Sequence, residues 1–242
     1  MTLLLTDNEE LLNRFLALLK KKGIDRSSFD FAYSPVNHLM ADKYEDQTWI
    51  VPLRVKNSVG AIIEKYNLVL SLHSKQLFPP ELVRNVRCIN IHPGLNPHNR
   101  GWFPQVFSII NHLPCGATIH EMDDELDHGP IIAQKEIKIE LTDTSISVYD
   151  KVLDAEIELL DAWLERILKH DYETFVPEEG NVNLKKDFDA LCHLNLDDVG
   201  TMAEHIDLLR ALTHGNYANA FFIDKNGEKI FVKIELFKKN DL

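Results

Sequence analysis

An amide and an imidazole lie two residues apart at the end of an apolar run, in the segment CINIHPGLNPHNRGWFP (residues 88–104). In a β-strand, residues i and i+2 point to the same side, so Asn90 and His92 are expected to project together. An amide can donate a hydrogen bond to an oxygen that gains negative charge, and an imidazole can accept a proton near neutral pH. The plain alternative is a strand end whose polar side chains only find hydrogen-bond partners.

The elements that must position this pair alternate between strands and helices. Residues 3–6 predict a strand and residues 7–23 a helix, because leucines and phenylalanine recur at helical spacing. Thr6 and Glu9 fit a capping box, and Gly23 is placed to end the helix. Further strands are expected within residues 28–34, 48–55, 67–74, 116–122 and 129–140, and helices within 59–66 and 104–113; residues 81–93 are expected to be a helix end that leads into another strand. This alternation favours an α/β fold, a Rossmann-like, mostly parallel sheet with flanking helices, whose ligands bind at the carboxyl edge of the strands.

The C-terminal third has a different texture. A long helix is expected after Thr142, and polar, loop-rich sequence begins at about residue 172. A helix then covers residues 199–212, and Asn226-Gly227 between alternating apolar residues predicts a β-hairpin. Its second strand would place these residues on one face: Ile230, Val232, Ile234 and Leu236. We therefore expect a core over residues 1–171 and a small helix-plus-hairpin subdomain over residues 172–242, whose apolar face covers the core or pairs with a second subunit.

Composition excludes several classes of protein. The 242 residues carry a net charge of −12, which argues against extended nucleic-acid contact but permits a small anionic ligand. No apolar run is long enough for a membrane span, and the N-terminus does not resemble a signal peptide. Three widely spaced cysteines indicate reduced thiols in a cytoplasmic protein. His98, His120 and His128 lack metal-ligand spacing such as HExxH, so no metal is expected, and His120 is expected to pack on its strand.

Two separated segments, INIHPGLNPHNRG and GATIHEMDDELDHGPII, resemble the motifs of the folate-dependent formyltransferases. Those enzymes carry Asn-x-His, Pro and a turn ending in Arg-Gly, and later a Gly-x-Thr-x-His strand with an Asp-x-Gly turn. The matching positions are Asn90, Ile91, His92, Pro93, Arg100, Gly101, Gly116, Thr118, His120, Asp127, Gly129, Ile131 and Ile132. The resemblance covers residues 68–140 closely and the N-terminal strands loosely. This sequence departs from the usual HxSLLP, with Gly94 in place of Ser and Asn96 before Pro97.

The resemblance implies that Asn90, His92 and Asp127 are the catalytic trio. Formyl transfer to an amine passes through an oxyanion, to which Asn90 can donate. His92 can accept the amine's proton or stabilise the oxyanion as a cation, and Asp127 can orient or charge the imidazole directly or through water.

The resemblance also implies N10-formyltetrahydrofolate as cosubstrate. Its pocket would be formed by two segments, with these residues: Gln76, Leu77, Phe78, Pro79, Met122, Asp123, Asp127 and His128. Taken alone, LFPPE would be a plain strand-to-helix connection with proline at the helix start.

The formyl acceptor depends on which members of the family the chain resembles. The first turn, LTDNEE, lacks the Gly-Ser-Asn phosphate loop of the glycinamide ribonucleotide enzymes. The short tail and the strongly acidic chain disfavour a transfer RNA. The tail LLRALTHGNYANAFFIDKNGEKIFVKIE resembles that of enzymes acting on nucleotide-linked amino sugars, particularly dTDP-4-amino-4,6-dideoxyglucose. The substrate-binding residues this implies are Asn8, Lys75, Arg100, Gly101, Trp102, Gln105, Tyr217 and Asn219. Tyr217 would stack on the base and Asn219 would bind its edge, unless Trp102 and Tyr217 only pack.

Three other functions remain open from the sequence. The trio would also serve a hydrolase that releases formate from formyltetrahydrofolate, or a transferase acting on another small amine such as glycinamide ribonucleotide. A non-catalytic nucleotide-binding or dimerisation module is the third. The sequence does not fix the sugar, its amine-bearing carbon, the base or the oligomer, although the apolar hairpin favours a homodimer.

Overall fold

The structure, a computed structural model, describes residues 1–239 and contains two compact units. The first unit comprises Met1–His92, Ala117–Lys135 and Ala155–Pro177. The second comprises Pro93–Gly116, Glu136–Asp154 and the chain from Glu178 onward. The domain boundary expected after residue 171 stays a prediction.

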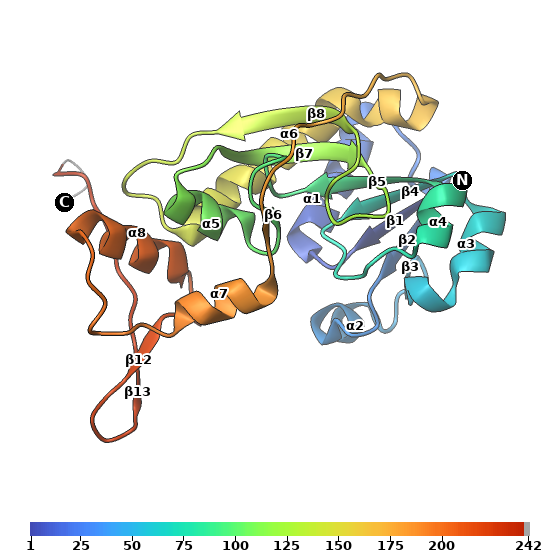
Figure 1. The fold of residues 1–242 in the computed structure, drawn as a ribbon. Helices are drawn as coiled ribbons and strands as arrows, with labels where there is room; N and C mark the ends of the chain where they lie inside the picture. The colour runs from blue at the N-terminus through green and yellow to red at the C-terminus, as the bar shows by residue number, and fades with distance from the viewer. Residues whose placement is uncertain (240–242) are drawn as a thin grey trace. The chain divides into compact units, whose positions relative to one another are not determined.

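A seven-stranded sheet organises the first unit, in the order β3-β2-β1-β4-β5-β7-β8 (Figure 1). Its strands are β1 (Thr2–Thr6), β2 (Phe29–Tyr33), β3 (Ile50–Pro52), β4 (Leu68–Leu72), β5 (Arg87–His92), β7 (Cys115–Glu121) and β8 (Ile131–Ile137). The five strands from β3 to β5 run parallel, and β7 is antiparallel to β5. The predicted mostly parallel α/β sheet is therefore confirmed.

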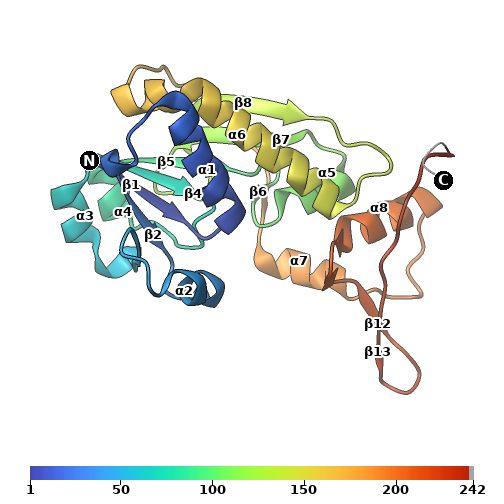
Figure 2. The ribbon, with the colours of Figure 1, turned by 180° about the vertical axis from the view of Figure 1, so that it is seen from behind.

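Helices cover both faces of this sheet. The helices are α1 (Glu9–Lys22), α2 (His38–Tyr44), α3 (Val59–Lys65), α4 (Pro80–Asn85) and α6 (Ser145–Lys169), with 3-10 turns at Arg26–Ser28 and Val55–Asn57. Helices α1 and α6 lie on one face, and α3 and α4 lie on the other (Figures 1 and 2). On the second face, Leu5, Val69 and Cys88 of three strands pack with Ile62 and Leu82 of the helices. Burial on both faces explains why the strands are nearly continuous apolar runs.

The start of α1 differs from the sequence prediction. The N-cap is Asn8, whose Oδ1 accepts a hydrogen bond from the Leu11 amide at 3.0 Å. The capping box predicted for Thr6 and Glu9 is wrong, because Thr6 is the last residue of β1 and its hydroxyl contacts the Asn8 backbone. Gly23 ends the helix as predicted, in the left-handed conformation at φ 65°.

Short helices and two-residue strands build the second unit. They are β6 (Arg100–Gly101), α5 (Pro104–Asn111), β9 (Val182–Asn183), α7 (Lys185–Cys192), α8 (Met202–Leu212), β10 (Thr213–His214), β11 (Tyr217–Ala218), β12 (Phe221–Ile223) and β13 (Lys229–Phe231). Its core joins Val106 and Ile109 of α5 to Val152 of α6 and Leu212 of α8. The Asn96-Pro97 peptide bond is cis.

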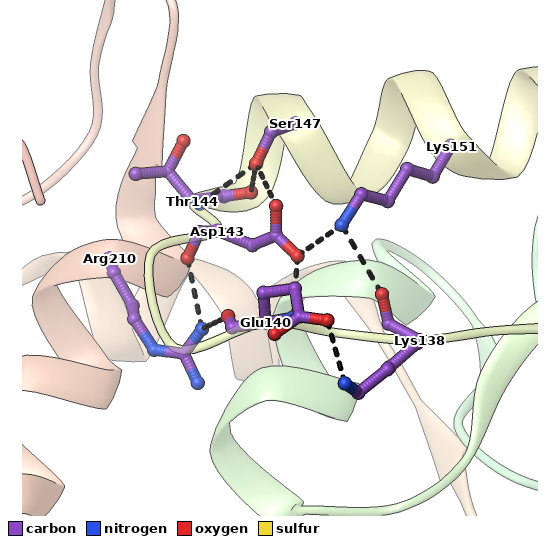
Figure 3. Close-up of polar contacts among 7 residues, drawn as sticks. All are labelled: Lys138, Glu140, Asp143, Thr144, Ser147, Lys151 and Arg210. Atoms are coloured by element: carbon purple, nitrogen blue, oxygen red, sulfur yellow. Dashed lines mark hydrogen bonds and ion pairs between the residues drawn. The ribbon is translucent and has the colours of Figure 1, made fainter. Parts of the chain in front are cut away.

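A buried arginine holds the chain that leads into α6 (Figure 3). Arg210 of α8 donates to the carbonyl oxygens of Glu140, at 3.2 Å, and Asp143, at 2.9 Å, and to the carboxylate of Asp207. The Asp143 carboxylate in turn accepts from Ser147 and Lys151 on the first turns of α6. This cluster fixes the start of the longest helix against α8.

The predicted C-terminal hairpin is present but short. Residues Asp224–Glu228 close the turn between β12 and β13, with Gly227 at φ 84°. Strand β13 ends at Phe231, so Ile234 and Leu236 do not share a strand face with Ile230 as predicted. Within residues 1–239, no helix has the length and apolar character needed to cross a membrane.

Candidate active site

The three residues predicted as a catalytic trio lie together in the first unit. The Asn90 amide Nδ2 donates to Asp127 Oδ1 at 3.0 Å, and His92 Nδ1 lies 3.6 Å from Asp127 Oδ2. The first contact is a normal hydrogen bond, whereas the second is a longer charge contact. The side chains of His92 and Asp127 are largely buried. Two distant segments thus bring an amide, an imidazole and a carboxylate to one place.

Strand pairing explains how the trio assembles. Asn90 and His92 lie two residues apart on β5 and share one face of the strand. The antiparallel register places His120 opposite Asn90 and Thr118 opposite His92. After β7 the chain turns back, with hydrogen bonds from the Met122 amide to the Cys88 carbonyl and from the Glu121 amide to the Pro130 carbonyl. Asp127 lies in this turn with a left-handed backbone, at φ 49°. Glycine is needed two residues later, at Gly129, because a Cβ there would overlap the Glu121 carbonyl.

His120 is a fourth member of the site that the sequence analysis assigned only to packing. Its Nδ1 lies 2.8 Å from the Glu121 carbonyl oxygen, which can only accept, so Nδ1 carries the hydrogen. Nε2 is then an acceptor, and the Asn90 amide donates to it at 3.3 Å. Burial lowers the pKa of His120, although the Asp127 charge opposes that shift. A neutral His120 is therefore a second acceptor for the Asn90 amide, and its Nε2 lies 3.9 Å from Asp127 Oδ1.

Two segments predicted to bind the cosubstrate also meet in the first unit. Phe78 and Met122 pack against the same apolar cluster, and Arg84 of α4 pairs with Asp124. Leu77 is 79 % exposed, and Pro79 caps α4. Together these contacts bring the chain before α4 beside the chain after β7.

Some polar side chains of the same two segments contact other residues of the chain. Gln76 accepts from the Val55 amide and donates to the Leu53 carbonyl, both at 2.9 Å. The carboxylate of Asp123 lies 2.7 Å from His128 Nδ1. Gln76 therefore fixes the position of its own segment.

Two of the predicted substrate-binding residues lie at the carboxyl ends of β1 and β4. Asn8 directs Nδ2 toward His73 Nδ1 at 3.5 Å, and the Lys75 amide donates to Asp7 Oδ2 at 2.7 Å. Asp7 also accepts from the Ser34 amide and from Asn37. Asn8 contacts His73 and Lys75 contacts Asp7, so the segments that follow β1 and β4 lie beside each other.

The other predicted substrate-binding residues belong to the second unit. Arg100 is buried and Gly101 pairs with Asn183, where a Cβ on Gly101 would overlap the Asn183 carbonyl. Trp102 is half exposed and its ring lies 5.7 Å from that of Phe103. The loop itself is fixed by buried Asn99, whose Oδ1 accepts from three asparagine amides: those of Asn111, Asn181 and Asn183.

A chain of contacts joins Gln105 to Tyr217 within that unit. Gln105 Nε2 donates to Ser145 at 3.4 Å, and the Ser145 hydroxyl lies 3.0 Å from His214 Nδ1. The His214 ring is 5.8 Å from Tyr217, which is 68 % exposed. Asn219 donates its amide to the Leu212 carbonyl at 3.1 Å, so part of the side chain that was predicted to bind a base stabilises the β10–β11 turn. Ser145 and His214 had no sequence signal that separated them from packing residues.

Among residues 1–239, no cluster of three or more His, Cys, Asp or Glu side chains is arranged to hold a metal ion.

Comparison with known proteins identifies related families along most of the chain. A family model described as formyl transferase matches residues 38–164, and one described as N-formyltransferase dimerization C-terminal domain matches residues 187–238. A dTDP-4-amino-4,6-dideoxyglucose formyltransferase of Mycobacterium bovis is 52 % identical over 183 residues, which are 75 % of this chain and 78 % of that protein. A methionyl-tRNA formyltransferase of Ligilactobacillus salivarius is 32 % identical over 54 % of this chain and 43 % of its own length.

Two solved structures match nearly the whole chain. A 4-N formyltransferase from Francisella tularensis has a TM-score of 0.92 at 45 % identity, and 98 % of each chain is covered. A sugar N-formyltransferase from Shewanella sp FDAARGOS_354 has a TM-score of 0.92 at 46 % identity, with the same coverage.

Proposed function

Because this chain belongs to the formyl transferase family, we propose that it transfers the formyl group of N10-formyltetrahydrofolate to the amine of dTDP-4-amino-4,6-dideoxyglucose. The observation that carries this proposal is the 52 % identity to a protein named for that substrate, over three quarters of this chain. The assembled trio supplies the chemistry that the transfer needs.

The segments of the first unit around Phe78 and Met122 fit the cosubstrate. A folate ring system is flat and apolar on its faces and has hydrogen-bonding groups on its edge. Phe78 and Met122 supply apolar surface, and the chain at residues 76–79, fixed by Gln76, supplies backbone donors and acceptors. We assign Gln76, Leu77, Phe78, Pro79, Met122, Asp123, Asp127 and His128 to this pocket.

The trio and His120 divide the work of the reaction. Bound formyltetrahydrofolate would supply the formyl carbon as electrophile and N10 as the leaving nitrogen. Asn90 donates to the formyl oxygen as negative charge develops there. Both hydrogens of the Asn90 amide are used by Asp127 and His120, so this donation replaces one of those bonds. The bond to Asp127 is the one we expect to be exchanged, because Asp127 also faces His92.

His92 moves protons in this scheme. The carboxylate of Asp127 accepts only, so its position favours a hydrogen on His92 Nδ1 and leaves Nε2 as the basic nitrogen. Nε2 then takes a proton from the attacking amine and returns it to the leaving nitrogen. Asp127 stabilises the imidazolium that forms between these two steps.

We also propose which residues of each unit bind the nucleotide sugar. In the first unit, these are Asn8, which follows β1, and Lys75, which follows β4. In the second unit, buried Arg100 is suited to a phosphate, and exposed Tyr217 to stacking on a base. Gly101, Trp102, Gln105 and Asn219 complete the proposed set.

We also propose a homodimer formed through the C-terminal region, as the description of its matching family model indicates. A cytoplasmic location is consistent with the three buried free cysteines.

An assay of the purified protein tests the proposal. With formyltetrahydrofolate and dTDP-4-amino-4,6-dideoxyglucose, we expect a formamido sugar nucleotide by mass spectrometry and an equal amount of tetrahydrofolate. UDP- and GDP-linked amino sugars serve as controls for the base. Release of formate without any amine would instead support a formyltetrahydrofolate hydrolase, and no turnover of any amino-sugar nucleotide would overturn the proposal.

A further inference from the structure

A histidine–glutamate pair lies outside the trio in the first unit. Glu156 of α6 is 0 % exposed, and its Oε1 lies 2.8 Å from His73 Nε2. Its second oxygen, Oε2, is buried and accepts no hydrogen bond from residues 1–239. Burial raises the pKa of Glu156, while His73 and, more weakly, Arg14 of α1 act against that shift. His73 is therefore the main group that favours the carboxylate form of Glu156.

The backbone and tautomer of His73 are both fixed. His73 has φ 56°, a left-handed conformation that is uncommon for a residue other than glycine. Asn8 Nδ2, which can only donate, lies 3.5 Å from His73 Nδ1. The hydrogen of a neutral His73 therefore belongs on Nε2 and points to Glu156. A strained residue whose two ring nitrogens are both directed is typical of a functional position.

The pair lies at the edge of the sheet that carries the trio. His73 follows directly on β4, which pairs in parallel with β5, and Leu72 is the register partner of Ile91. His73 and His92 are the residues that follow those two partners, so their backbones are neighbours on strands about 4.8 Å apart. The His73 ring is directed toward α6 through its contact with Glu156. The His73 side chain is 11 % exposed, so part of this side chain reaches the surface.

The proton balance of the proposed transfer calls for a second acceptor. At neutral pH the sugar amine arrives as an ammonium with three N–H bonds and leaves as a formamide with one. It therefore gives up two protons while the new C–N bond forms and the bond from the formyl carbon to the leaving nitrogen breaks. One proton ends on the leaving nitrogen by way of His92, and the other must reach solvent.

We propose that His73, backed by Glu156, accepts this second proton from the substrate ammonium before attack and then releases it to water. The contact between Asn8 Nδ2 and His73 Nδ1 breaks, and His73 takes the substrate's proton on Nδ1. The ring is then an imidazolium paired with the Glu156 carboxylate. Glu156 acts as a positioning residue, because it reaches the substrate only through His73. The inference rests on the proposed transfer to an amine and assigns one step of it to residues outside the trio.

The alternative is that the pair only supports the turn after β4. The variant Glu156→Gln separates the two, because the glutamine oxygen still accepts from His73 but cannot stabilise its protonated form. The matched control is Glu158→Gln, the same change two residues along α6, where Glu158 pairs with Lys135 at the surface.

Steady-state rates across pH form the first arm of the test. We expect kcat/KM of Glu156→Gln to fall by about 10- to 100-fold at about pH 6.5, and to return to within about twofold of the parent at about pH 9, where more substrate is unprotonated. Glu158→Gln should follow the parent at every pH. A Glu156→Gln to parent ratio that does not vary with pH would overturn the inference while leaving the transfer activity in place. Absence of turnover by the parent protein at every pH would overturn the proposed function first, and this inference with it.

A second arm does not depend on activity. Nitrogen-15 spectra of the histidine rings should show His73 of the parent as the Nε2–H tautomer at neutral pH. The thermal unfolding temperature of Glu156→Gln should be no lower than that of the parent, because a buried carboxylate has been removed. An Nδ1–H tautomer, or a large loss of stability accompanied by a pH-independent loss of rate, would show a supporting role only.

Discussion

The Asn90 amide nitrogen donates to two groups of different kinds. Asp127 accepts one amide hydrogen and His120 accepts the other, which fixes the plane of the amide. His120 can accept only while it is neutral, and the Glu121 carbonyl and the low pKa of the buried ring keep it so. The orientation of the Asn90 amide thus depends on the protonation of His120.

The low pKa of His120 has a consequence for stability. Above pH 6.5 the ring is neutral in both the folded and the unfolded chain, so it has no effect on the pH dependence. As the pH falls below 6.5, the unfolded chain takes up a proton that the folded chain refuses until its lower pKa is reached, and stability falls by about 1.4 kcal/mol per pH unit for such a group. Partly buried His214, whose pKa is also lowered, acts in the same direction.

We therefore expect His120→Gln to reduce the acid dependence of folding. In urea unfolding between about pH 7.5 and 5, the unfolding free energy of the variant should decline less steeply as the pH falls. The expected difference in slope is that of one proton, about 1.4 kcal/mol per pH unit. The variant His38→Gln, which alters a surface residue, is the control and should keep the parent slope. Equal slopes for His120→Gln and the parent would show that His120 titrates normally in the folded protein.

Some of these residues could be predicted from sequence and others could not. Asn90 and His92 follow from the two-residue period of a strand, and Asp127 from its place in a motif. The role of His120 depends on the antiparallel register between β5 and β7, which no local pattern specifies. Glu156 falls on a helical stripe of α6, and only the tertiary structure shows that it lies against His73.

At the scale of elements, the turn between β7 and β8 carries Asp127 and leaves little room for change. A Cβ on Gly129 would overlap the Glu121 carbonyl, so Gly129→Ala must shift the backbone next to Asp127. We expect kcat to fall by about 100-fold, as small misplacements of catalytic groups do. Activity measured at saturating substrate tests this.

Gly60→Ala is the matched control for that substitution. Gly60 lies in α3, and an added Cβ there meets no atom within 4 Å. We expect unchanged activity and a gain of about 0.4–1 kcal/mol in unfolding free energy. Wild-type kcat in Gly129→Ala would contradict the tight turn around Asp127.

Arg210 holds α8 to the chain before α6 in the second unit. Replacing it with methionine leaves two carbonyl groups and the Asp207 carboxylate without their donor. We expect a loss of about 3 kcal/mol in unfolding free energy by urea titration. Lys185→Met, which breaks an exposed pair with Asp189, should cost at most about 0.5 kcal/mol. Similar losses for the two variants would mean that Arg210 is not an anchor.

The sequence predicted helices and major strands well, and small elements poorly. The helical spacing of residues 7–23 and the turn at Asn226-Gly227 are local signals, and both predictions are confirmed. The two-residue pair β6–β9 joins Arg100 to Val182, 82 positions apart, and depends on the buried Asn99 amide cluster. Such pairing carries no periodic signal. The N-cap moved to Asn8 because β1 extends through Thr6.

At the scale of the whole molecule, alternating strands and helices were enough to predict a parallel α/β sheet. The order β3-β2-β1-β4-β5-β7-β8 and the reversal of β7 come from long-range pairing and could not be predicted. The use of the hairpin also stays open from sequence. Its apolar side chains remain partly exposed, with Phe231 at 51 %.

The proposed homodimer gives those side chains a partner. We expect Phe231→Glu to shift the protein from dimer to monomer in sedimentation experiments, because a charge would be buried at the interface. Val199→Glu, at a fully exposed apolar residue of the same unit, should remain dimeric. Circular dichroism checks that both variants fold. A Phe231→Glu protein that stays dimeric would show that the hairpin does not form the interface.

The central claim is that Asn90, His92 and Asp127 act as one catalytic unit in formyl transfer. The most direct measurement is kcat for Asn90→Ala, His92→Gln, Asp127→Asn and the His92→Gln/Asp127→Asn double variant, with formyltetrahydrofolate and the amino-sugar nucleotide both saturating. We expect each single variant to lose at least about 100-fold, and the double variant to lose little more than the worse of its two parents, because groups that act together are not additive. A His92→Gln or Asp127→Asn enzyme within a few-fold of the parent rate, or fully additive losses, would contradict the account.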